Sequence, residues 1–172
     1  ALPHLSKQEK RIVEKKFYHH FCDNFVEMIK TMTISDSEIE KRFKFTNLEV
    51  YLEMEKRGKS IALFCSHYGS YEWLISMNRK ITFKGYAIYK TIRNKYFDKL
   101  VRNIRAKFHA HLIDTKETIN VIHENQKNGI KGVYGFASDQ SPKASKAFHW
   151  GDFFGVRVPM HTGAEMIAKR MD

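Results

Sequence analysis

The sequence predicts an α/β fold with a mainly parallel sheet flanked by helices. After residue 58, short apolar segments typical of buried strands alternate with segments whose apolar residues recur every three or four positions. Strands that alternate with helices favour parallel pairing, with helices on both faces of the sheet. The 172 residues are 42% hydrophobic, and no linker or internal repeat divides them. We therefore expect one domain over 1–172, with a helical portion at about 8–57 and an α/β core at about 58–172.

The N-terminal portion is expected to be helical throughout. Residues 8–32 carry apolar and aromatic side chains at helical spacing, which predicts an amphipathic helix. An aromatic stripe of this kind is more typical of a core contact than of a membrane contact. Two capping boxes follow, at Ser35-x-x-Glu38 and Thr46-x-x-Glu49. The second should open a helix that Gly58 ends.

The α/β core is predicted from the alternation of the two apolar patterns. The expected strands are 60–66, 86–91, 109–113 and 131–137, and the expected helices are 70–79, 95–107, 115–127 and 161–171. On the helix at 95–107, Arg105 and Lys107 lie beside the apolar stripe and could reach a phosphate or carboxylate, although such charges usually form a solvated face. The segment Phe153-Phe154-Gly155-Val156 is expected to be an apolar loop, either filling the core or walling a cleft.

The charge balance predicts an acidic partner. The chain has 30 Lys and Arg residues against 19 acids, a net charge of +11, which would attract nucleic acid, an anionic membrane surface or an acidic carrier protein. The bases are scattered and form no nucleic-acid motif, which argues against nucleic acid. Cys22 and Cys65 lie far apart, so we expect a reducing compartment. No apolar run approaches about 18 residues and no signal peptide is present. We interpret the chain, which begins without Met and stops after a helical pattern, as part of a longer protein.

The most informative motif is His67-Tyr-Gly-Ser-Tyr-Glu72, at a predicted strand–turn–helix junction. A His followed five positions later by an acid also occurs at His4 and His109, so the spacing alone is weak evidence for a catalytic pair. In this context, however, His67 lies at the carboxyl edge of the sheet, where α/β folds place their sites. His67 could deprotonate a hydroxyl, Glu72 could hold the imidazole, and Ser70 could cap the helix. The alternative is a packed core histidine.

A second acid lies on the same predicted rim. Asp139 follows the strand at 131–137, again at a carboxyl edge, and could orient an arginine or cap a loop. Without further information either role is equally compatible with the sequence.

Taken together, these blocks resemble the lipid A biosynthesis acyltransferases, the lauroyl/myristoyl transferase family related to the glycerolipid acyltransferases. The His67–Glu72 run resembles the family's His-x4-Glu/Asp motif, and Asn94-x-x-x-Asp98 followed by Arg105-x-Lys107 resembles its Asn-Pro, acid and Arg-x-Arg block. The strand leading into Asp139-Gln140 and the Phe153-Phe154-Gly155 segment resemble two later blocks, in the family's order. Ser70 stands where Asn is usual, and Lys95 where Pro is usual.

The resemblance implies a glycerolipid-acyltransferase-like fold and transfer of an acyl group from acyl-acyl carrier protein, or less readily acyl-CoA, to a hydroxyl of a glycolipid. His67 would take the hydroxyl proton, Glu72 would fix the tautomer, and backbone amides near Gly69 would stabilise the oxyanion. Arg105, with Lys107 and Asp139, would bind substrate. No cofactor or metal is implied. Acyl carrier protein, anionic membrane lipid and the glycolipid acceptor are the expected partners, at the cytoplasmic face of the bacterial inner membrane, with the anchor in a segment missing from this chain.

Several alternatives remain open from the residues. An ornithine lipid or a lysophospholipid could be the acceptor instead. Cys65 and His67 lie on one strand face, as a cysteine-dependent enzyme would require, although buried strand cysteines are usually inert. His109-x-His111 with His67 or Asp139 would suit zinc, but no Cys or acid cluster completes the set. A non-enzymatic basic module that binds a membrane or nucleic acid is the last alternative.

Overall fold

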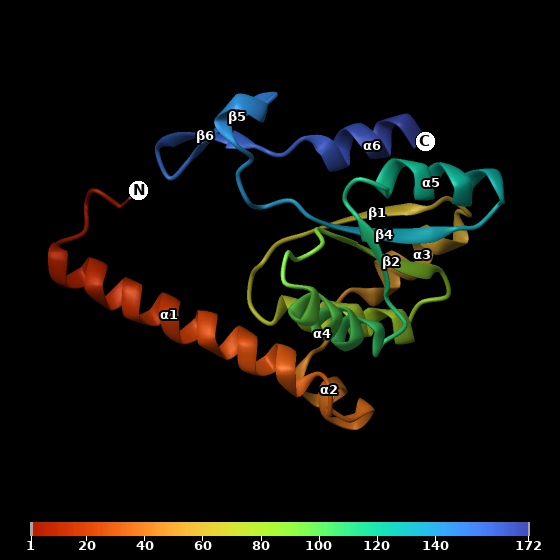
Figure 1. Cartoon of the computed structure of the whole chain (residues 1–172), viewed down its shortest axis with the longest axis horizontal. Helices are drawn as coiled ribbons and strands as arrows, with labels where there is room; N and C mark the ends of the chain where they lie inside the picture. Colours follow the sequence, from red (N-terminus) through yellow and green to blue (C-terminus); the bar gives the residue numbers. More distant parts are fainter. Residues whose placement is uncertain (1, 172) are drawn as a thin grey trace.

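The computed structural model describes residues 2–171 and confirms the α/β class. A parallel sheet of four strands has the order β1-β4-β2-β3 (Figure 1). The strands are β1 (Ile61–Cys65), β2 (Lys84–Tyr89), β3 (His111–Asp114) and β4 (Gly132–Ala137). All four predicted strands are therefore present, with every boundary within two residues of its predicted position.

Helices cover both faces of the sheet, as the alternation predicted. One face carries α5 (Thr118–Lys127) and α6 (Gly163–Met171), which pack on Tyr86, Tyr134 and Phe136 through Ile122 and Ala164. The other face carries η1 (Tyr71–Arg79), α4 (Lys95–Ala106) and α3 (Leu48–Lys56). Figure 1 shows these two layers above and below the strands.

The register of β1 and β4 determines which loops meet. Ile61 pairs with Val133 and Cys65 with Ala137, so the two parallel strands end at the same level. The loops that follow them begin side by side, and Ser138 donates its N–H to the carbonyl of Cys65 at 3.2 Å. This pairing brings the segments that carry His67 and Asp139 together, as expected for one rim of a parallel sheet.

The N-terminal helices begin at polar caps. In α1 (Lys7–Lys30), Ser6 and Glu9 form a complete capping box, which the sequence analysis did not identify. In α2 (Asp36–Arg42), Ser35 accepts from the N–H of Glu38, as predicted. The cap predicted at Thr46 is wrong, because α3 starts at Leu48 after Asn47 and has no side-chain cap. Gly58 follows the end of α3 at φ 70°, where glycine has no Cβ penalty.

The prediction that the aromatic stripe of α1 is a core contact is wrong for most of its length. Met28 is buried, but Phe17, Phe21 and Phe25 are 59%, 47% and 43% exposed. The helix contacts the body near its carboxyl end, where the indole N–H of Trp73 donates to the carbonyl of Glu27 at 3.3 Å. Its amino-terminal half extends away from the sheet (Figure 1), and no element within residues 2–171 buries the stripe there.

Two further elements differ from the predictions. The segment expected to be a helix at 70–79 is the 3₁₀ helix η1, and the Ser70 side chain makes no cap bond. Instead, the Ser70 carbonyl accepts from the N–H of Trp73, the three-residue spacing of a 3₁₀ turn. The expected apolar loop is the turn of a hairpin, β5 (His149–Phe153) and β6 (Val156–Met160), preceded by the short 3₁₀ turn η2 (Ala144–Lys146). Within residues 2–171, no helix has the length and apolarity needed to cross a membrane.

Candidate active site

His67 lies in the loop after β1 and is held by Asp139 at two points. Its ring Nδ1 is 2.8 Å from Oδ1 of Asp139, and its backbone N–H donates to Oδ2 at 2.9 Å. The ring also packs edge-on against Tyr71, with centroids 4.9 Å apart. The two bonds tie the loop after β1 to the loop after β4 and fix the orientation of the imidazole.

The charge on Asp139 determines which ring nitrogen carries the proton. Burial alone would raise the pKa of Asp139, but the hydrogen bonds from the side chain and backbone of His67 outweigh it and hold this pKa below its usual range. An ionised carboxylate accepts only, so in the neutral imidazole the hydrogen is on Nδ1 and the lone pair is on Nε2. An imidazole held in this way can accept a proton at Nε2.

Glu72 does not contact the imidazole as expected. The described residues contain no hydrogen bond between His67 and Glu72; instead, Glu72 accepts from Nε of Arg105 at 3.0 Å and from Nη2 of Arg105 at 2.5 Å. The expected hydrogen bond is therefore corrected: Asp139 holds His67, and Glu72 holds Arg105. The physical reason is that Glu72 is only 7% exposed and faces α4, where a guanidinium fork satisfies both of its oxygens.

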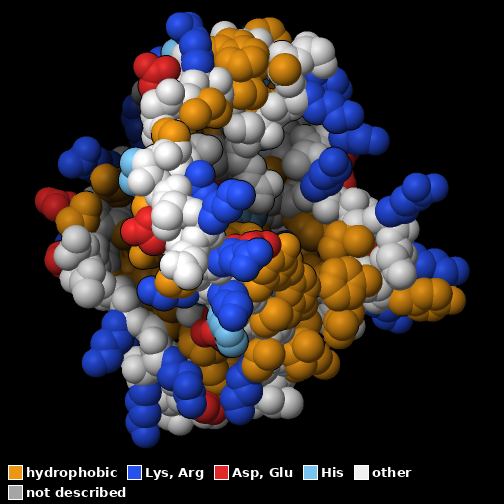
Figure 2. Space-filling model, turned by 90° about the vertical axis from the view of Figure 1, so that its left-hand side faces the viewer, with side chains coloured by type: hydrophobic (Ala, Val, Ile, Leu, Met, Phe, Trp, Pro, Cys, Tyr) orange, Lys and Arg blue, Asp and Glu red, His pale blue; other side chains and the backbone are white. Residues whose placement is uncertain are grey.

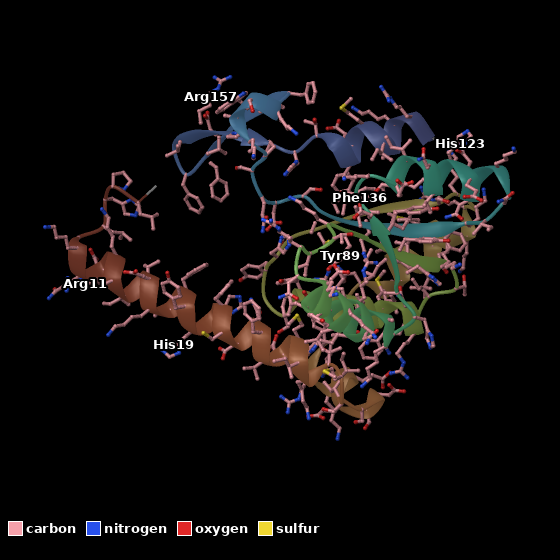
Figure 3. All side chains as sticks on the ribbon, in the orientation of Figure 1. Arg11, His19, Tyr89, His123, Phe136 and Arg157 are labelled. Carbon is pink, nitrogen blue, oxygen red and sulfur yellow. The ribbon has the colours of Figure 1, made fainter. Side chains whose placement is uncertain are left out.

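Arg105 is fixed by a second set of contacts at the end of β2. Its guanidinium lies 5.1 Å from the ring centre of Tyr89, and Arg102 lies 5.0 Å from the same ring. The Tyr89 hydroxyl donates to Asp98 at 2.6 Å; burial and this bond raise the pKa of Tyr89 to about 12. Figure 3 shows Tyr89 between α4 and the strands. Tyr89 was not predicted as a site residue, although its place near the carboxyl end of a predicted strand could have indicated it.

The ion pair leaves part of the Arg105 guanidinium available. Burial alone would lower the pKa of Arg105, but the hydrogen bond and charge of Glu72 raise it above its ordinary value. The side chain is 21% exposed, and Nη1 has no acceptor among the described residues. A fixed guanidinium with free N–H groups can donate to an anionic oxygen.

A cavity of about 150 Å³ is lined by side chains of both groups, the one around His67 and the one around Arg105. It lies between η1 and strands β1, β2 and β4, and His67, Glu72 and Arg105 are among its lining residues. The rest of the lining is mainly apolar and includes Leu63, Cys65, Ile75, Met77, Ala87, Ile88, Val133 and Ala137. An apolar pocket with a few polar groups at fixed positions is the usual form of a small-molecule site.

The other predicted site residues are placed differently. Gly69 lies in the turn after His67 at φ 59°, a conformation that favours glycine. Lys107 is not brought into the group: its Nζ donates to the carbonyls of Met32 and Ile34, in the segment after α1. Its role in the structure is to satisfy backbone acceptors there.

The structure also bears on the rival chemistries. Burial and the charge of Asp139 raise the pKa of Cys65, which disfavours the thiolate that a nucleophilic cysteine needs. In the part of the chain that the structure describes, no group of three or more His, Cys, Asp or Glu residues could hold a metal ion.

Comparison with known proteins gives one family match. The family described as bacterial lipid A biosynthesis acyltransferase matches the chain over residues 1–172. No curated protein matches it significantly.

Proposed function

The chain belongs to the bacterial lipid A biosynthesis acyltransferase family, and from that premise we propose that it moves a fatty acyl group from an acyl-carrier-protein thioester to a hydroxyl of a membrane glycolipid of the lipid A precursor type. The family makes it an enzyme, an acyltransferase acting on a lipid. The observation that carries the finer proposal is the His67–Asp139 pair beside an apolar cavity.

In the proposed reaction, the acceptor hydroxyl oxygen attacks the thioester carbonyl while Nε2 of His67 takes the hydroxyl proton. A C–O bond forms, and the carbonyl oxygen carries the negative charge of the tetrahedral intermediate. Collapse of this intermediate breaks the C–S bond, and the proton on His67 passes to the leaving thiolate. No covalent enzyme intermediate is required, because the base and both substrates act in one addition and one elimination.

The proposal divides the polar groups between two tasks. Asp139 keeps the hydrogen of His67 on Nδ1 and stabilises the imidazolium that forms, the task first expected of Glu72. Glu72 is a positioning residue that holds Arg105. The free N–H groups of Arg105, with backbone amides near Gly69, would then donate to the oxyanion or to a phosphate of the acceptor.

The apolar cavity supports the choice of a fatty acyl group. Its lining offers carbon surface on η1 and on the sheet, and His67 shares the same space. An acyl chain placed there would lose its exposed surface to water, which favours binding at about 0.8 kcal/mol for each buried CH₂. The thioester carbonyl at the start of the chain would then lie near the imidazole.

The proposed partners follow from charge and chemistry. A net charge of +11 suits an acidic carrier protein and anionic lipid, and the reaction would take place at the cytoplasmic face of the inner membrane. A thioester is already activated, so the proposed mechanism needs no cofactor. An ornithine lipid or a lysophospholipid is the alternative acceptor, to be compared in the same assay.

The test is acyl transfer by the full-length protein carrying His67→Ala, with acyl-acyl carrier protein as donor and a phosphorylated glycolipid as acceptor. General base catalysis contributes about 10²–10⁴-fold, so turnover should fall by at least about 100-fold. His123→Ala is the matched control, because His123 is exposed on α5, away from the site (Figure 3). Activity of His67→Ala within about threefold of wild type would refute the proposal.

A further inference from the structure

The tip of the β5–β6 hairpin has an unusual residue for its backbone. Phe153 pairs with Val156, so Phe154 and Gly155 form a two-residue turn, with φ 50° and 73°. Positive φ at both positions is the pattern of a type I′ turn, for which Asn-Gly is strongly preferred. A bulky residue is rare in this conformation. Phe154 is also 69% exposed, so it serves neither the turn nor the core.

One face of the hairpin is apolar near the tip. Phe153, Val156 and Val158 alternate onto the same side, and Phe153 and Val156 are 57% and 45% exposed. On the opposite side, Asp152 pairs with Arg157 next to the tip, and Trp150 pairs with Pro159 further from it. Two strands alone are marginally stable in water and need a covering on their apolar face. Within residues 2–171, no element buries the side chains at the tip.

The same side of the molecule carries the uncovered aromatic face of α1. Phe17, Phe21 and Phe25 contact one another in a row, with ring centres 6.0 and 5.0 Å apart. Arg11 and His19 lie on the side of α1 that faces away from the hairpin (Figure 3). Figure 2, which views the side to which α1 and the hairpin both extend, shows hydrophobic side chains in an upper and a lower area, with Lys and Arg side chains between and around them.

Resting on the proposed function, in which the acceptor is a membrane lipid, we infer that the hairpin inserts its Phe153–Phe154 tip into the interface of an anionic bilayer. Exposed aromatic side chains flanked by Lys and Arg suit this environment, because the rings enter the headgroup region while the cations pair with lipid phosphates. A purely apolar protein partner would not explain the surrounding positive charge. The carboxyl edge with His67 would then face the lipid surface.

The test is co-sedimentation of the purified protein with phosphatidylcholine vesicles that contain or lack phosphatidylglycerol. Phe154→Asn is the decisive variant, because Asn suits the left-handed turn position and should preserve the fold. Removing one inserted phenylalanine should weaken binding to the anionic vesicles by about tenfold. Ile119→Asn is the matched control: Ile119 is 51% exposed on α5, and its variant should bind within about twofold of wild type.

The outcomes are separable from those for catalysis. Vesicle binding does not require turnover, so His67→Ala should bind like wild type whatever its activity. Unchanged binding by Phe154→Asn with an intact melt would overturn the inference. So would a wild-type dimer, detected by light scattering without lipid, that Phe154→Asn converts into monomers, because the hairpin would then be a contact between copies of the chain.

Discussion

Asp139→Asn changes one atom of the carboxylate and should nevertheless abolish most of the activity. Asp139 accepts at both oxygens, from the backbone N–H of His67 at 2.9 Å and from its Nδ1 at 2.8 Å. Asparagine has one oxygen and one NH₂ group. If the oxygen keeps the backbone bond, the NH₂ group faces Nδ1, which must then give up its hydrogen. The hydrogen moves to Nε2, and the imidazole can no longer take a proton there.

The expected loss follows from this change of tautomer. Where the same substitution disrupts a histidine base, the rate falls by about 10⁴-fold, and we expect kcat to fall by about 10²–10⁴-fold here. Steady-state transfer from acyl-acyl carrier protein to the glycolipid measures it, beside thermal melts of both proteins. Asp36→Asn is the control, since Asp36 is an exposed carboxylate that pairs with Arg79. A kcat within about threefold of wild type would show that Asp139 does not set the state of His67.

Three further predictions concern two residues that line the cavity and one buried carboxylate outside it. Arg105→Lys should impair turnover almost as much as Arg105→Ala, because an ammonium cannot replace the fork on Glu72; thermal melts should show a cost of about 3–5 kcal/mol for the alanine variant, which strands a buried carboxylate. Gly85→Ala places a Cβ 1.9 Å from Oδ1 of Asn78 at the cavity wall, so the length of the preferred acyl chain should change, as measured by mass spectrometry of the product. Adding Asn78→Ala to this variant should restore the wild-type preference, because it removes the clashing side chain. Glu55 is buried and accepts from the backbone of residues 82 and 83. These bonds lower the pKa of Glu55 despite its burial. The ionised carboxylate therefore stabilises the fold at neutral pH, and this effect is lost as the pH falls through the folded pKa. Glu55→Gln should reduce the free energy of unfolding, measured in urea, by about 1–3 kcal/mol at pH 7 and by less at pH 3.

The strands and most helices were predictable because their signals are local. Apolar runs of strand length and apolar residues at helical spacing depend on neighbours in sequence, and they located all four strands of the sheet. The position of Asp139 on the rim with His67 was also predictable, since parallel strands end at the same edge. The hairpin was not, because Gly151 and Pro159 weaken its strand pattern and Phe-Gly is an uncommon turn.

The exposure of α1 could not be read from its periodicity. A helical stripe shows that one face differs from the other, but it does not show whether another element reaches that face. Met28 packs in one cluster with Tyr89 and Ile104, whereas Phe17 is exposed. At 1.5 Å per residue, the 24 residues of α1 span about 36 Å, and the buried contact is near the carboxyl end of the helix, at Met28.

The partner of Glu72 shows most clearly what sequence spacing leaves undecided. Glu72 lies five positions after His67, which makes contact between them feasible, yet a buried carboxylate takes the partner that best offsets its lost hydration. Arg105, 33 positions away, offers a fixed two-pronged donor from α4, while Asp139, 72 positions from His67, is already aligned by the β1–β4 register. Each acid is therefore matched to the base that tertiary structure presents to it. The contacts of the motif are therefore assigned by the fold: Asp139 holds the imidazole of His67, and Glu72 holds the guanidinium of Arg105.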